Sequence, residues 1–166
     1  MSEELGVPGT LEQINSAIVG RMLERYGEDP PLIPGAVEAV RGVAEHWPVA
    51  IASSSNPELI EVVLATARLD DVVQVVVSSQ EVARGKPAPD VYLEAARRLG
   101  VAPTGCAAVE DSENGIRSAK AAGMLVIAVP NPHFPPDDEA VAEADLVLAS
   151  IRELTPDVIG RAAGSR

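Results

Sequence analysis

Short apolar runs alternate with longer amphipathic stretches over most of this 166-residue chain, and this alternation narrows the choice of fold more than any other feature. The runs are rich in Val, Ile and Ala, and turn-forming residues bound them. They cover Val49 to Ala52, Val72 to Val77, Cys106 to Val109 and Leu125 to Val129, with a weaker run from Leu146 to Leu148. Helices are expected between them at 57–67, 88–99 and 113–122. This pattern predicts an α/β fold in which helices cover both faces of a parallel sheet.

Two helices are expected before the first strand. Apolar residues recur at helical spacing from Leu11 to Tyr26, directly after Thr10, which is a residue that can cap a helix. The sequence Asp29-Pro30-Pro31 should end this helix. A second apolar stripe begins at Pro34-Gly35 and ends near Trp47.

Composition and charge exclude several classes of function. Hydrophobic residues make up 46% of the chain, which is enough for one domain with a buried core. The formal net charge of -12 disfavours binding to nucleic acids and to anionic membrane surfaces. Because Cys106 is the single cysteine, no internal disulfide can form. No apolar run approaches the roughly 18 residues of a membrane span, and the first four residues lack the features of a signal peptide. We therefore expect a cytoplasmic protein.

Hydroxyl groups follow the first expected strand, in the sequence Ser53-Ser54-Ser55-Asn56. Ligands of open parallel sheets bind beyond the carboxyl ends of the strands. Ser53 is therefore a candidate for binding a phosphate oxygen, together with Ser54 and Asn56. Capping of the next helix is the competing role, and it accounts better for Asn56 and for Ser55, since Pro57 suits the first position of a helix.

A lysine lies on a loop that prolines stiffen, in the sequence Gly85-Lys86-Pro87-Ala88-Pro89-Asp90. A solvated lysine is the usual alternative for any single lysine, but a surface lysine would not need such a frame. We expect Lys86 to neutralise charge on a phosphoryl group. Asp90 fits the first turn of the following helix, where negative charge is favoured.

Two adjacent carboxylates, Glu110 and Asp111, close the third expected strand. At a buried strand end they would repel each other unless a cation lies between them. Mg²⁺ suits such a pair because it takes oxygen ligands and keeps waters and a phosphate oxygen. Asp111 is the stronger candidate ligand, and Glu110 is either a ligand or a partner of one. The alternative is that both only begin a helix. Gly115 should let that helix approach the sheet closely.

In this order the three motifs resemble those of the haloacid dehalogenase superfamily of hydrolases, most closely its phosphatase and beta-phosphoglucomutase-like branch. The resemblance runs from about Leu32 to Leu154. It implies a Rossmann-like core at 31–166, a remnant of a helical cap at 1–30, a Mg²⁺ cofactor and a small phosphorylated metabolite as substrate. It also implies that Lys86 pairs with the carboxylate that attacks phosphorus.

In that family the first core strand ends in Asp-x-Asp, and its first aspartate is the nucleophile. No two aspartates stand one residue apart in this chain. We therefore expect the first, central strand and most of the cap to be missing. The strands ending at Ala52 and Val109 would then expose unpaired edges to each other. We expect the chain to be poorly stable alone or to close the gap by pairing these strands directly, and self-association through the gap is a further expectation.

Three functions stay open at this stage. The first is a magnesium-dependent phosphohydrolase that acts on a small phosphomonoester, present here without its nucleophile. The second is a hexose-phosphate mutase, which shares the Glu110-Asp111-Ser112 motif. The third is a pseudoenzyme that binds phosphate or metal without turnover. In each case the chain alone should not turn over, because a covalent mechanism fails without its nucleophile.

Overall fold

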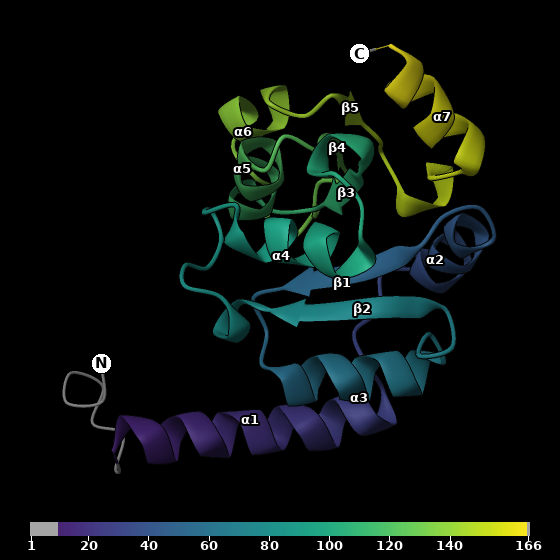
Figure 1. Ribbon diagram of the computed structural model, residues 1–166. Coiled ribbons are helices and arrows are strands. Elements are labelled where there is room, and N and C mark those ends of the chain that lie inside the picture. The colour runs from purple at the N-terminus through teal and green to yellow at the C-terminus, as the bar shows by residue number, and fades with distance from the viewer. Residues whose placement is uncertain (1–9, 166) are drawn as a thin grey trace.

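The computed structural model describes residues 10–165, and its first element is α1 (Leu11–Glu28). Thr10 caps this helix: its hydroxyl accepts from the Gln13 amide at 3.2 Å, and the Gln13 side chain accepts from the Thr10 amide at 2.9 Å. The predicted first helix is thus confirmed and extends two residues further. Figure 1 shows that α1 lies along α3 (Pro57–Ala67), and no residue of α1 is fully buried. The first nine residues of the expected cap remnant lie outside the described range.

The expected alternation of strands and helices follows. The strands are β1 (Val49–Ser53), β2 (Val73–Ser78), β3 (Ala107–Glu110), β4 (Leu125–Ala128) and β5 (Leu146–Val147). The helices after α1 are α2 (Ala36–Ala44), α3, α4 (Asp90–Leu99), α5 (Glu113–Ala121), α6 (Asp138–Ala142) and α7 (Pro156–Gly164), and short 3-10 turns cover Ser79–Glu81, Pro103–Gly105 and Ile151–Glu153. In the described part of the chain, no helix combines the length and the hydropathy needed to cross a bilayer.

All strand pairs in the structure are parallel, which confirms the predicted α/β class. β1 pairs with β2, and Ser53 lies opposite Ser78 at their carboxyl ends. β3, β4 and β5 pair in that order, and Glu110 lies opposite Ala128. Each strand ends one residue away from its predicted end. In three of the five strands the polar residue after the apolar run still pairs, namely Ser53, Ser78 and Glu110, and the other two strands end one residue early.

A gap separates the two groups of strands. Among residues 10–165, no strand lies between β1 and β3, so each of these strands has one unpaired edge. The expectation that β1 and β3 close the gap by pairing directly is wrong. A cavity of about 1230 Å³ occupies the space instead, and every residue of both strands lines it. Val109 is 38% exposed although its sequence predicted a buried strand, because the cavity leaves part of β3 uncovered.

Helices bridge the two groups of strands on both sides, which explains why the gap stays open. α4 packs on β1 and β2, and its buried residues share one core cluster with β3, β4 and α5. On the other side, Ala39 of α2 joins a cluster with Ile127 of β4 and Ile159 of α7, while Val40 packs against the cluster under α3. Because these helices are already seated on both half-sheets, β1 and β3 cannot approach without unpacking one of them.

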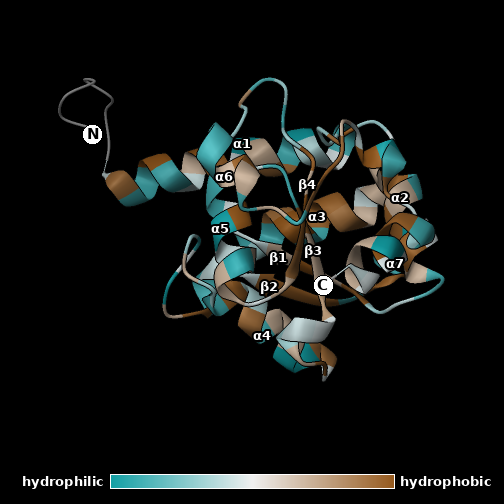
Figure 2. Cartoon of the chain, turned by 90° about the horizontal axis from the view of Figure 1, so that it is seen from above, coloured by the Kyte–Doolittle hydropathy of each residue, from teal (hydrophilic) through white to brown (hydrophobic). Residues whose placement is uncertain are grey.

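Apolar residues concentrate where the strands and helices meet. Figure 2 shows hydrophobic colour along the strands at the centre and mixed colour on the surrounding helices. The fully buried side chains include Val77, Val91, Ile116, Val126 and Ile127, which come from strands and from the inner faces of α4 and α5. The predicted coverage of the sheet by helices is therefore present, apart from the gap.

Candidate active site

The carboxyl ends of β1 and β3 line the cavity, and the end of β2 is hydrogen-bonded to the segment that follows β1. The Ser78 hydroxyl, at the end of β2, donates to the Ser55 carbonyl just beyond β1 at 2.7 Å. Lys86, on the loop after β2, forms an ion pair with Glu110 at the end of β3. The three segments predicted from the sequence thus come together, and Ser53, Ser54, Lys86, Glu110 and Asp111 all line the cavity.

The serine segment forms a turn rather than an open row of hydroxyls. The Ser53 hydroxyl accepts from the Ser55 amide at 3.1 Å, which uses one of its two lone pairs and leaves its proton available to donate. Ser54 and Ser55 are exposed at the cavity. Asn56 is the residue that caps α3, its side chain makes no capping hydrogen bond, and it is not among the residues that line the cavity.

The lysine loop is held by a turn of its own and by a hydrogen bond from α5. The Ala88 amide donates to the Gly85 carbonyl at 3.0 Å, and the buried Ser118 hydroxyl of α5 donates to the Ala88 carbonyl at 2.6 Å. The Lys86–Pro87 peptide bond is cis. Asp90 begins α4, as expected. The loop directs Lys86 inward, and its side chain is only 10% exposed.

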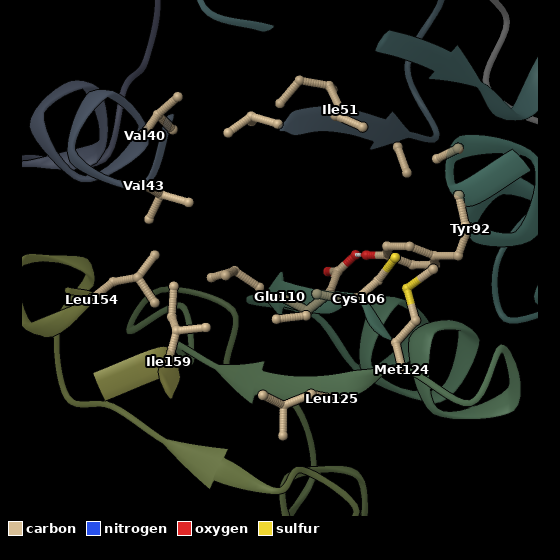
Figure 3. A pocket seen from close by; sticks show the side chains of 18 of the residues that line it. Val40, Val43, Ile51, Tyr92, Cys106, Glu110, Met124, Leu125, Leu154 and Ile159 are labelled. Atoms are coloured by element: carbon tan, nitrogen blue, oxygen red, sulfur yellow. Dashed lines mark hydrogen bonds between the residues drawn. The ribbon is translucent and has the colours of Figure 1, made fainter. Parts of the chain in front are cut away.

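Glu110 is the centre of a buried polar network that the sequence did not reveal in full. Its carboxylate accepts from Lys86 and from the Tyr92 hydroxyl, and it also accepts from the Ser112 hydroxyl at 3.3 Å. In Figure 3 the Tyr92 ring extends from α4 so that its hydroxyl meets the Glu110 carboxylate at the cavity. Gly115 lies directly behind this carboxylate, since a methyl group there would come within 1.8 Å of the Glu110 Oε2. The close approach expected at Gly115 is confirmed.

Tyr92 is the site residue that sequence reasoning missed. It is buried in the first turns of α4, and the 3.5 Å distance between its hydroxyl and Lys86 Nζ adds a second contact. An aromatic residue on an amphipathic helix usually signals core packing. The signal that could have identified Tyr92 was its position six residues after Lys86, on the helix that directly follows the lysine loop.

Tyr92 should stay protonated in strongly alkaline solution. Burial raises the pKa of its hydroxyl, and the negative charge of Glu110 raises it further. An unfolded tyrosine ionises near pH 10, so the unfolded state loses its proton first as the pH rises. Stability should therefore fall above about pH 10 by roughly 1.4 kcal/mol per pH unit. In a Tyr26→Phe variant, phenolate absorbance should appear together with loss of the far-UV circular dichroism. A phenolate signal from folded protein near pH 10 would contradict this result.

Asp111 differs from Glu110 in having a free carboxylate. It is half-buried at the cavity, and no hydrogen bond or ion pair engages its side chain within residues 10–165. The Asn131 amide lies 3.5 Å from its carbonyl oxygen. The described residues contain no group of three or more His, Cys, Asp or Glu side chains that could hold a metal ion. Asp111 could therefore supply one ligand to a cation such as Mg²⁺, which usually takes the rest of its coordination shell from water and substrate.

The sequence also matches a family model. Residues 5–123 match the model of the haloacid dehalogenase-like hydrolases. The chain belongs to this hydrolase family. It is 38% identical over 151 residues to hexitol phosphatase B of Escherichia coli, an alignment that covers 90% of this chain and 68% of the relative. The haloacid dehalogenase resemblance drawn from the three motifs is thereby confirmed.

Solved structures of the family have the same fold. CbbY from Rhodobacter sphaeroides, in complex with xylulose-1,5-bisphosphate, is 30% identical with a TM-score of 0.78, and the match covers 89% of this chain and 67% of CbbY. The beta-phosphoglucomutase of Clostridium difficile is 24% identical with a TM-score of 0.76 and coverages of 93% and 65%. The haloacid dehalogenase-like chain therefore spans about two thirds of the length of these relatives.

Proposed function

We propose that this chain carries the phosphate-binding and metal-binding part of a magnesium-dependent phosphohydrolase that acts on a small phosphomonoester. One observation carries the proposal: three segments up to 58 positions apart bring hydroxyls, a lysine and a free carboxylate to the mouth of one cavity. Phosphatase relatives that include hexitol phosphatase B support the same reaction class. A sugar phosphate is the substrate class that these relatives favour.

Each residue has a distinct role in this proposal. Ser53 and Ser54 donate to oxygens of the phosphate, and Lys86 offsets its charge. Asp111 would hold Mg²⁺, and Glu110 would orient Lys86 and approach the metal through water. When bound, Mg²⁺ supplies charge neutralisation at the phosphoryl oxygens. The attraction of the phosphate to Mg²⁺ and to Lys86 has to exceed the repulsion from a chain that carries a net charge of -12.

The attacking group has no candidate in these 166 residues, which contain no Asp-x-Asp. A phosphohydrolase therefore needs an aspartate brought next to Lys86, and the cavity between β1 and β3 offers the room for it. A pseudoenzyme that binds phosphate without turnover is the second candidate, favoured by this same absence. A hexose-phosphate mutase would use the same binding residues, so only the cap could distinguish it.

The proposed division of the chain into domains is a cap remnant at 1–30 and a core at 31–166.

The unpaired edges of β1 and β3 support one further element of the proposal. Free backbone donors and acceptors beside an apolar cavity favour pairing with another chain. Self-association through this gap is therefore proposed, together with low stability of the isolated chain. A cytoplasmic location is also part of the proposal.

Asp111→Asn should abolish most of the metal binding while leaving the fold intact. Titration calorimetry of the 166-residue chain should detect the binding of Mg²⁺ and of inorganic phosphate. The substitution should weaken Mg²⁺ binding at least about tenfold, which is a loss of binding free energy near 1.4 kcal/mol. The exposed Asp70→Asn is the matched control and should bind like the wild type. The same samples should not hydrolyse p-nitrophenyl phosphate, because the nucleophile is lacking. Equal Mg²⁺ affinity in both variants would disprove the assignment of Asp111 as a metal ligand. Turnover of p-nitrophenyl phosphate would disprove the expectation that the chain alone is inactive.

A further inference from the structure

Tyr92 touches the lysine of the site in two ways. Its hydroxyl lies 3.5 Å from Lys86 Nζ, and the same ammonium group lies 4.8 Å from the centre of the Tyr92 ring. A cation at that distance from an aromatic face is attracted by the ring quadrupole. The lysine therefore has both a polar and an aromatic contact with one side chain of α4.

The two residues also share an acceptor. Lys86 Nζ and the Tyr92 hydroxyl both donate to Oε1 of Glu110. Tyr92 is 7% exposed and Glu110 is 8% exposed, so this triangle is closed to solvent on the side away from the cavity. An ammonium group has three donors, and the contacts in residues 10–165 account for two of them. The third remains for a ligand in the cavity.

We infer that Tyr92 is a positioning residue, which holds the Lys86 ammonium at the cavity mouth so that its remaining donor meets the bound anion. A lysine side chain has four rotatable carbons and loses its direction unless something restrains it. Glu110 alone supplies attraction but little direction, whereas the rigid Tyr92 ring fixes one side of the ammonium. This inference rests on the proposed function, because it assigns the anion to that same site.

The chain is well suited to a direct test because it contains only two lysines, Lys86 and Lys120. Lys120 is 39% exposed, pairs with Asp145 at 3.1 Å and does not line the cavity, so it is an internal reference. Acetylation by an N-hydroxysuccinimide ester, followed by peptide mass spectrometry, gives the ratio of the two rates. In the wild type, Lys86 should react more slowly than Lys120, since it is 10% exposed and held by two partners.

Tyr92→Phe removes only the hydroxyl and should raise the Lys86 to Lys120 ratio at least about threefold, because the ammonium then leaves its site more often. Tyr92→Leu removes the ring as well and should raise the ratio further. Val91→Ala is the matched control, since Val91 is buried on the same helix and has no polar or aromatic group that could hold the ammonium. That variant should lower the melting temperature without changing the ratio. A ratio that is the same in the wild type, Tyr92→Phe and Tyr92→Leu would overturn the inference.

Inorganic phosphate separates this inference from the proposed function. Phosphate should slow the acetylation of Lys86 in the wild type and have a weaker effect in Tyr92→Phe. If phosphate changes the Lys86 rate in neither protein while the substitution still raises the ratio, the positioning role stands and the phosphate site is wrong. If phosphate protects Lys86 equally in both proteins, Tyr92 does not position the lysine for the anion.

Discussion

Gly115→Ala is expected to unfold a large part of the population, although it adds only one methyl group. That methyl group would lie 1.8 Å from the Glu110 Oε2 and 2.1 Å from its carboxyl carbon. Both residues are buried, so neither can move aside without breaking other contacts. The Glu110 carboxylate would have to leave Lys86 and Tyr92, and breaking a buried ion pair costs about 3–5 kcal/mol. Such a loss is comparable with the whole stability of a small domain.

Urea unfolding followed by circular dichroism measures this effect directly. Gly42→Ala in α2 is the matched control, because nothing lies within 4 Å of the added methyl group. It should stabilise the protein by up to about 1 kcal/mol, since alanine is the better helix former. Similar unfolding midpoints for the two variants would mean that the contact between α5 and Glu110 is looser than the structure indicates.

Lys86→Met is expected to destabilise the protein more than any loss of a surface charge. The substitution leaves the Glu110 carboxylate 7% exposed without its cation, and the cost of an unpaired buried charge is about 3–5 kcal/mol. Replacing both partners, as in Lys86→Met with Glu110→Gln, should recover most of this loss because no uncompensated charge remains. The double variant should thus be more stable than Lys86→Met alone, which is the sign of direct coupling.

The control for this experiment is an ion pair of good geometry on the surface. Arg97 pairs with Glu94 through two hydrogen bonds of 2.7 Å, but its side chain is 71% exposed. Arg97→Met should therefore change the unfolding midpoint little. If Lys86→Met were as mild as Arg97→Met, the Lys86 and Glu110 side chains would have to be solvated in solution.

Sequence patterns predicted the elements of the fold well where local signals agree. α3 begins and ends at the predicted residues because Pro57 fixes its first turn and Arg68 ends it in the left-handed conformation. The end of the chain was harder. No helix was predicted after the last strand, yet α7 runs from Pro156 to Gly164, since Thr155 caps it and Ile159 packs into the core. Gly160 and Gly164 lower the local helix propensity there, and tertiary packing overrode this preference.

The sequence predicted the separate segments of the site, but it did not predict the contacts between their side chains. Strand order brings Ser53, Lys86 and Asp111 to one cavity, which a parallel sheet makes predictable. The partner of Lys86 could not be predicted from spacing, since Glu110 lies 24 positions away and equally fits a metal site. For Asn56 the local signal was the better guide. Its position before Pro57 predicted a helix cap, and Asn56 is the cap residue of α3 and does not line the cavity.

The gap between β1 and β3 also bears on how the molecule comes apart. The β1–β2 pair and the β3–β4–β5 sheet share no ladder hydrogen bonds within residues 10–165. They are joined by the packing of α2 and α4 and by side-chain contacts such as the Lys86–Glu110 ion pair. Backbone amides on one side can therefore lose protection against hydrogen exchange while those on the other side keep it. We expect the two parts to open as separate cooperative units in hydrogen exchange, and a segment that paired with both β1 and β3 would merge them into one.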